Sequence, residues 1–155
     1  MSIDSVKISH DDRNRLSTLK RRTGVGNWNI LCRWAFCTSL AADEQPRNLE
    51  KKEPDSQELS QVDESTPQET EDAPSGKTII DLMTWATFGG DQADVYLALL
   101  KTRCVQDNIT PTDENLALQL KLHLHRGIGY LVGGKDKVQT LADLATRAAG
   151  QPTTT

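Results

Sequence analysis

The chain has 155 residues, of which 36% are hydrophobic and 26% charged, and its formal net charge is −4. This length suits a single domain, and no stretch approaches the ~20 consecutive apolar residues that span a bilayer. The N-terminus also lacks the basic segment and apolar run of a secretion signal, so we expect a cytoplasmic protein that does not enter a membrane.

Charge is distributed unevenly along the chain. Residues 1–40 hold seven Lys and Arg against three Asp and Glu, a net charge of +4, whereas residues 41–76 hold three against eleven, a net charge of −8. Residues 77–155 are balanced at eight against eight. Because salt screens charges within about 10 Å at ~0.1 M, a ligand responds to the local field. The basic N-terminal part therefore favours nucleic acid in spite of the acidic total.

The first forty residues predict a strand followed by two helices. Val6 and Ile8 alternate with polar residues, which is the pattern of a short strand. Ser9 is a suitable N-cap for a helix that ends at Gly24, a candidate for the left-handed conformation after a helix. A second helix at 28–42 is apolar almost all the way round, so one face is expected to pack within the subunit and the other against a second subunit.

The middle of the chain, from Asp43 to Gly76, is rich in Glu, Gln, Ser, Pro and Asp. Such a segment cannot bury enough apolar surface to offset the entropy lost on ordering, so we predict a disordered acidic linker. A solvated insert is the main interpretation, and acidic mimicry of DNA is the alternative. The predicted divisions are a basic strand-helix-helix segment at 1–42, the linker at 43–76, a C-terminal helical part of the same domain at 77–150 and a flexible tail at 151–155.

The C-terminal half predicts a short strand and three helices. In order, these are a short strand or extended segment at 79–85, a turn at Phe88-Gly89-Gly90, a helix capped by Asp91, a helix capped by Thr110 with Pro111 in its first position that runs to about Val132, and a helix over about 137–149. The predicted fold class is mainly α, with a short N-terminal strand followed by a helical domain that a disordered acidic linker interrupts.

A block of three cations precedes a glycine-containing turn and the second helix. A cation cluster beside exposed helix-start amides suits a phosphate backbone, because both attract anions, and glycines let the backbone come close. The alternative is a solvated helix end, where the helix dipole favours cations in any case. Arg33 has a further alternative, a salt bridge across a subunit interface. The candidate DNA-binding residues are Lys20, Arg21, Arg22, Gly24, Gly26, Asn27, Arg33, Lys7 and Arg126.

No arrangement of residues predicts catalysis, a cofactor or a metal. His123 and His125 lie two residues apart on a predicted helix, so they point to opposite sides and cannot share one ion. We interpret them as structural or interface histidines. The cysteines Cys32, Cys37 and Cys104 form no C-x-x-C pair and are expected to be buried free thiols, poor surroundings for a stable thiolate. Close helix packing is expected at Gly127 and Gly129.

Several long runs resemble one known family. They are Lys20–Gly24, Asn27–Cys37, Phe88–Gly90, Tyr96–Lys101 and Leu122–Leu131. These runs are similar to the DndE family of bacterial DNA sulfur modification systems, which replace a non-bridging phosphate oxygen with sulfur. The resemblance implies a homotetrameric component that binds double-stranded DNA, prefers nicked DNA and works with other DNA sulfur modification proteins. We expect those partners, not this chain, to perform the sulfur chemistry.

Two other classes of function are alternatives. A ribbon-helix-helix transcription regulator has the same order of strand, helix, turn and helix, and Ser5, Lys7 and Ser9 would then read bases. Such a regulator does not need the C-terminal half, and a sequence preference in a gel shift would reveal it. An enzyme acting on DNA or sulfur is the second alternative. The sequence shows no clustered carboxylates, metal ligands or activated nucleophile for it, and a metal assay with an activity test would decide.

Overall fold

The structure is a computed structural model that describes residues 3–47, 78–133 and 137–148. Its elements follow in the order β1 (Ser5–Ser9), α1 (His10–Thr23), α2 (Trp28–Leu40), β2 (Ile79–Thr84), α3 (Trp85–Gly89), the short 3-10 helix η1 (Gly90–Gln92), α4 (Ala93–Gln106), α5 (Asp113–Val132) and α6 (Leu141–Ala148). The predicted mainly α class with a short N-terminal strand is confirmed.

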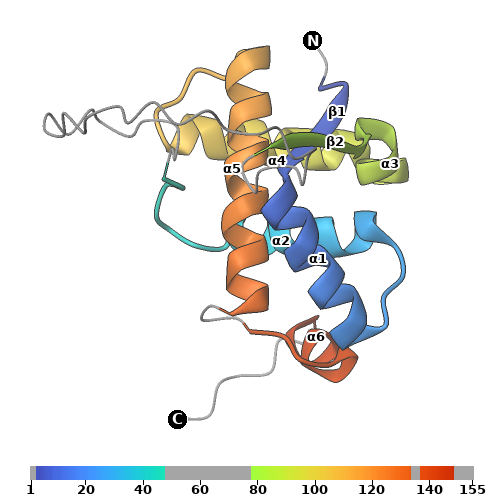
Figure 1. Cartoon of the computed structure of the whole chain (residues 1–155). Coiled ribbons are helices and arrows are strands. Elements are labelled where there is room, and N and C mark those ends of the chain that lie inside the picture. Colours follow the sequence, from blue (N-terminus) through green and yellow to red (C-terminus); the bar gives the residue numbers. More distant parts are fainter. Residues whose placement is uncertain (1–2, 48–77, 134–136, 149–155) are drawn as a thin grey trace, which may run out of the picture.

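Strands β1 and β2 form a two-stranded antiparallel ribbon beside the upper half of α5 (Figure 1). Ser9 lies opposite Ile79 in this ribbon, and the register shifts between Val6 and Lys7. Val6 and Ile8 are fully buried, as their alternation with polar residues predicts. Both predicted strands are therefore confirmed, and the ribbon joins parts of the chain that flank the predicted linker.

The two ends of α1 are fixed by local sequence. The Ser9 hydroxyl accepts a hydrogen bond from the Asp12 backbone N–H at 3.2 Å, which satisfies one of the free amides at the helix start. At the other end Gly24 has φ 72°, and its N–H donates to the Lys20 carbonyl at 2.9 Å. Glycine adopts this left-handed conformation without strain. The predicted cap and stop are both confirmed.

Helix α5 is the centre of the fold, with α1 running parallel beside it and α2 crossing behind (Figure 1). The crossing is close because Gly127 has no side chain: a Cβ placed there would lie 1.8 Å from the Ala35 carbonyl oxygen. Close packing at Gly127 is thus confirmed. The same prediction for Gly129 is wrong, since a Cβ there meets nothing within 4 Å.

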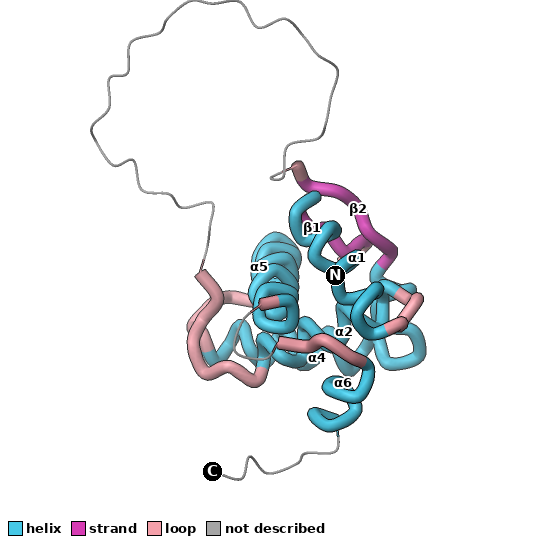
Figure 2. Tube along the Cα trace, turned by 60° about the horizontal axis from the view of Figure 1, so that its bottom comes forward, coloured by secondary structure: helices cyan, strands magenta, loops and turns pink. Residues whose placement is uncertain are grey.

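The inward face of α2 consists of Leu31, Cys32, Ala35 and Phe36, all buried. They join the apolar side of α5, the α1 leucines and residues of α3 and α4 in one hydrophobic core. Seen from the end of the bundle, α4 lies across α5, and α6 lies near one end of α1 (Figure 2). The prediction that one face of the second helix packs within the subunit therefore holds.

Two predicted caps are wrong. Asp91 lies within η1, and α4 begins at Ala93 without a side-chain cap. The cap of α5 is Thr112, whose hydroxyl accepts from the Asn115 N–H at 3.2 Å, and not Thr110. Both threonines precede acidic residues that suit the first turn of a helix. In the folded chain Thr112 is the N-cap, so Pro111 lies before the helix.

Other boundaries also differ from the sequence prediction. A one-turn helix, α3, follows β2 where only a turn was predicted, because the Thr84 hydroxyl accepts from the Thr87 N–H at 3.2 Å. Helix α2 ends at Leu40 instead of residue 42. Helix α6 begins at Leu141 instead of residue 137, and before it the Val138 N–H donates to the Leu131 carbonyl at 2.8 Å.

From residue 48 to its end, the predicted linker lies outside the described residues, as does the predicted tail at 151–155. Residues 43–47 belong to the described structure, and Pro46 is buried. The predicted division of the chain stays a prediction. None of the helices in the described ranges has both the length and the apolar character to cross a membrane.

Candidate nucleic-acid interface

Helix α1 concentrates positive charge on its solvent side. Its cations are Arg13, Arg15, Lys20, Arg21 and Arg22. At about 100° per residue, Arg13 and Lys20 lie on one flank of the helix, Arg15 and Arg22 on the other, and Arg21 between them on the outside. Arg13, Lys20 and Arg21 are exposed, whereas Arg15 and Arg22, on the other flank, are half-buried. Arg13, which the sequence prediction omitted, belongs with the exposed set.

The flank with Lys20 borders a shallow groove at the α1–α2 turn. The Lys20 ammonium lies 6.0 Å from the centroid of the Trp28 ring, and Arg13 lines the groove together with Gly26 and Asn27. Asp81 of β2 is the acidic residue in the opposite wall. Within the described residues neither Arg13 nor Lys20 forms an ion pair, so their charge is available to an anion.

The turn itself is open and carries donors. A Cβ at Gly24 or Gly26 would meet no described atom within 4 Å, so the described residues leave open space beside the backbone there. Asn27 is the N-cap of α2, yet its side chain caps no amide. The first turn of α2 contains no acidic residue. Its free N–H groups therefore add to the attraction that the cations exert on a phosphate.

Arg22 and Arg33, both predicted DNA ligands, have partners inside the chain. Arg22 donates to the Val132 carbonyl at 2.7 Å, at the C-terminal end of α5. Arg33 donates from Nε to the Phe88 carbonyl, and its guanidinium lies 5.8 Å from the centroid of the Tyr96 ring. The partner that Arg33 needs on an apolar helix is therefore a carbonyl and a ring in this chain. Both arginines hold helices together.

Lys7 lies apart from the α1 cations, on the outer face of the ribbon. Its Nζ is 3.9 Å from Asp81 Oδ1, and the same carboxylate accepts a hydrogen bond from the Ser5 hydroxyl at 2.9 Å. The Asp81 carboxylate contacts both Ser5 and Lys7, two of the residues that would read bases, and its negative charge repels DNA. The ribbon is also complete within one chain. These features disfavour the ribbon-helix-helix alternative.

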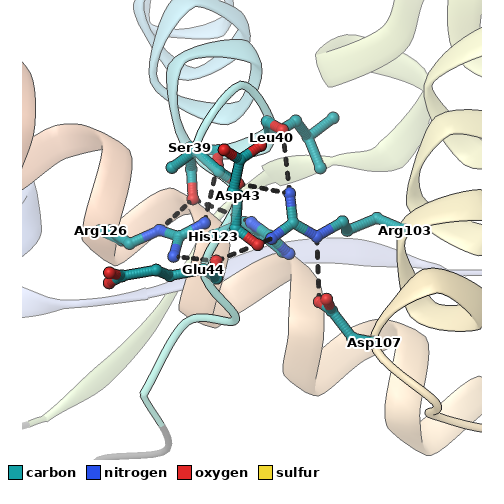
Figure 3. Close-up of polar contacts among 9 residues, drawn as sticks. Ser39, Leu40, Asp43, Glu44, Arg103, Asp107, His123 and Arg126 are labelled. Atoms are coloured by element: carbon teal, nitrogen blue, oxygen red, sulfur yellow. Dashed lines mark hydrogen bonds and ion pairs between the residues drawn. The ribbon is translucent and has the colours of Figure 1, made fainter.

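Arg126, the last predicted DNA ligand, binds the chain that leaves α2 (Figure 3). Its Nε donates to Ser39 Oγ at 2.8 Å and its Nη2 to the Ser39 carbonyl at 2.7 Å, while Nη1 donates to the Glu44 carbonyl. Arg126 therefore ties α5 to the end of α2 and to the segment that follows it, and the Ser39 carbonyl also accepts from the Ala42 N–H at 3.1 Å.

Arg103 of α4, which the sequence prediction missed, also binds the segment that follows α2. It is buried, and its Nε lies 3.0 Å from Asp107 Oδ2. Its two Nη atoms donate to the carbonyls of Leu40, Ala42, Asp43 and Glu44 at 2.7–3.2 Å. Carbonyl clustering of this kind leaves no local sequence signal.

The two histidines point to opposite sides of α5, as predicted. His123 is fully buried, with Nδ1 2.8 Å from the Ser39 hydroxyl. Burial, with Arg126 and Arg103 nearby, lowers the pKa of His123 to about 4. His125 instead places Nδ1 2.8 Å from Asp12 Oδ2 of α1. Across the described ranges, no three His, Cys, Asp or Glu residues gather as a metal site requires.

The cysteines are free thiols, of which Cys32 and Cys104 are buried. Cys37 is exposed in the single chain, contrary to the prediction that all three are buried. Burial raises the pKa of Cys32 to about 12, with a further contribution from Asp12. Burial also raises the pKa of Cys104, with a contribution from Asp107, and the partial desolvation of the Cys37 sulfur raises the pKa of that thiol although the residue is exposed. All three surroundings therefore disfavour the thiolate that sulfur carriage needs.

Comparison with known proteins identifies one family. The family model described as DNA sulphur modification protein DndE matches residues 5–63 and 60–139. The fold is similar to the crystal structure of DndE from Escherichia coli B7A involved in DNA phosphorothioation modification, with 22% identity and a TM-score of 0.53 over 84% of this chain and 98% of that chain. A search of curated proteins finds no match.

Proposed function

Because the chain belongs to the DndE family of DNA sulphur modification proteins, we propose that it is the DNA-binding component of that system and grips duplex DNA by the phosphate backbone. The observation that carries this proposal is the exposed, unpaired cationic flank of α1 beside the open turn at Gly24–Asn27. Phosphate contacts fix the position of a protein on DNA without reading sequence. The grip should therefore be nearly indifferent to sequence.

The residues proposed to contact phosphate differ in the share of DNA binding that we assign to them. Lys20 and Arg21 are exposed and have no acidic partner in the described residues, and Arg13 faces the same groove as Gly26. The predicted residues Arg22, Arg33 and Arg126 already donate to carbonyls, and Lys7 lies near Asp81. We assign these four a smaller share of DNA binding. Their positive charge still contributes to the local field.

We further propose that the chain works as a homo-oligomer, a tetramer as the family resemblance implies. The outward face of α2 supports this proposal, since Ile30, Trp34 and Cys37 line an apolar hollow with Tyr96. Helix α4, which carries Tyr96, also exposes Val95, Leu99 and Val105, with 51%, 42% and 63% of their surface accessible. Exposed apolar residues on two helices support the proposed interface.

An oligomer repeats the cationic flank, so one duplex can contact several copies. Linked contacts of this kind strengthen binding well beyond that of a single cluster. A nick adds a flexible joint to DNA, and the segments on its two sides can then reach clusters on different subunits at little bending cost. We propose a preference for nicked duplex on this ground. We assign no reaction to the chain and propose that its partners in the modification system perform the sulfur chemistry.

The DNA-binding proposal is tested by charge reversal on α1. Lys20→Glu and Arg21→Glu should weaken binding to two duplexes of unrelated sequence by similar factors, measured by fluorescence anisotropy. Lys101→Glu is the matched control, because it changes the net charge equally on α4, an element that does not carry the flank. Equal losses in all three variants would contradict the assignment to α1. A pull-down of the other modification proteins, with and without DNA, tests the proposed partners.

A further inference from the structure

A second cationic pocket lies between α1, α5 and the segment that follows α2. Its charged and aromatic lining consists of Arg15, Glu44, Arg47, His125, Arg126 and Tyr130, around a volume of about 380 Å³. We propose that this pocket binds a phosphate monoester, the doubly charged group found at a phosphorylated strand end or on a small phosphorylated molecule. The proposal goes beyond the backbone grip and does not depend on it.

The Arg126 guanidinium is preorganised for such a ligand. Three hydrogen bonds to Ser39 and Glu44 fix its guanidinium, and the Tyr130 ring centroid lies 5.9 Å from it. Each Nη carries two hydrogens and donates one to a carbonyl, so a second N–H on each remains for a ligand. The acceptors are neutral carbonyls and a hydroxyl, so these hydrogen bonds do not themselves neutralise Arg126, although the carboxylates of Glu44 and Asp107 lie near it. A fixed guanidinium loses little entropy on binding an oxyanion.

His125 is oriented by a buried carboxyl group. Its Nδ1 lies 2.8 and 3.0 Å from the two oxygens of Asp12, whose side chain is 2% exposed, whereas the side chain of His125 is 36% exposed. Because a carboxylate only accepts hydrogen bonds, Nδ1 carries a proton. Nε2 then lies on the edge of the ring away from Asp12. Arg15 Nη1 also lies 3.3 Å from Asp12, so one buried group holds two residues of the pocket lining.

The charge balance of the pocket is positive and favours an anion. Three arginines face the pocket against Glu44, while Asp12 is buried beneath it and already bonded to Arg15 and His125. A backbone phosphodiester has a single charge and a sugar on each side, whereas a monoester presents three oxygens to convergent arginines. Arg15 is also about 140° from Lys20 around α1, so the pocket and the backbone-binding flank are separate surfaces.

The experiment uses the full chain and two kinds of probe. In the first arm, inorganic phosphate is titrated at constant ionic strength and followed by amide NMR shifts. Arg15→Gln and Arg47→Gln should each weaken binding about fivefold or more, since each removes a charged donor worth ~1 kcal/mol or more. Lys101→Gln, a control on α4 that removes the same charge outside both proposed phosphate-binding surfaces, should leave phosphate binding unchanged. Arg15 and Arg47 are not core residues, and thermal melting verifies that the variants fold.

The second arm separates the two sources of the monoester. A duplex with a 5′-phosphate at a nick is compared with the same duplex carrying a 5′-hydroxyl. A gain from the phosphate that Arg15→Gln abolishes assigns the pocket to strand ends, while phosphate binding without that gain assigns it to small phosphorylated molecules. The proposal is overturned if phosphate produces no saturable shifts, or if both glutamine variants bind it like the wild type. Failure of Lys20→Glu to weaken duplex binding would refute the backbone grip alone.

Discussion

Protonation of His123 is expected to destabilise the folded chain in mild acid. The ring is fully buried, contacts the Ser39 hydroxyl at 2.8 Å and lies close to Arg126 and Arg103. Ser39 Oγ accepts a hydrogen bond from Arg126, so its own proton is directed to His123 Nδ1, which must be unprotonated to accept it. A protonated ring would lose this bond and face two guanidinium groups without water.

The size of the effect follows from the two pKa values. The folded pKa of His123 is about 4, against 6.5 for the ordinary imidazole. Because the unfolded chain takes up a proton below pH ~6.5 and the folded chain only near pH 4, the free energy of unfolding is unaffected above pH ~6.5 and falls between these values. At ~1.4 kcal/mol per pKa unit, the loss from His123 reaches about 3 kcal/mol near pH 4.

Urea unfolding of wild type and His123→Asn from pH 7.5 to 4.5 measures this contribution. Asparagine keeps an acceptor near the position of Nδ1 but does not titrate, so its stability should fall less over this range. His10→Asn is the matched control, because it removes an imidazole from the start of α1 but keeps His123 and its contact with Ser39, and it should therefore retain the loss of stability that His123 causes. Parallel curves for wild type and His123→Asn would refute the reasoning, since every other titrating group is common to both.

Further predictions concern packing, assembly and the linker. Gly127→Ala should destabilise the fold by ~1–3 kcal/mol or more in urea, because the new Cβ would lie 1.8 Å from the Ala35 carbonyl oxygen, whereas Gly129→Ala should cost nothing. Equal stability of the two variants would contradict the close crossing. Trp34→Glu should lower the mass found by light scattering, and a wild-type monomer would rule out the oligomer. Deletion of 48–76 should leave cooperative melting intact and DNA affinity equal or higher, because it removes negative charge; non-cooperative melting would show that the segment is structural.

Local patterns predicted the elements whose ends depend on neighbouring residues. Ser9 and Gly24 fix α1 by contacts within a few residues, so the sequence alone locates both ends. The start of α5 was misplaced because Thr110 and Thr112 both precede residues suited to a first turn, and only the surrounding fold selects Thr112. The pairing of β1 with β2 spans the whole predicted linker, and alternation in β1 shows that it is a strand without showing its partner.

The residues of the candidate site likewise fall into those that the sequence predicts and those whose role depends on distant contacts. The exposed cations of α1 follow from composition and helix periodicity, as at Lys20 and Arg21. Arg22, Arg33 and Arg126 look equally available in sequence, but their acceptor carbonyls lie 110, 55 and 87 or 82 residues away. Arg103 was missed for the same reason. Such pairs become visible only once the helices are placed beside each other.

The dependence of DNA affinity on salt tests the proposed backbone grip most directly. For the wild type, log affinity should fall linearly with log salt concentration, with the same slope for unrelated duplexes. Lys20→Gln with Arg21→Gln should flatten that slope by about 0.9 for each phosphate that the protein no longer neutralises, while the assembly stays intact. A double variant that keeps both the wild-type affinity and the wild-type slope would contradict DNA binding through α1.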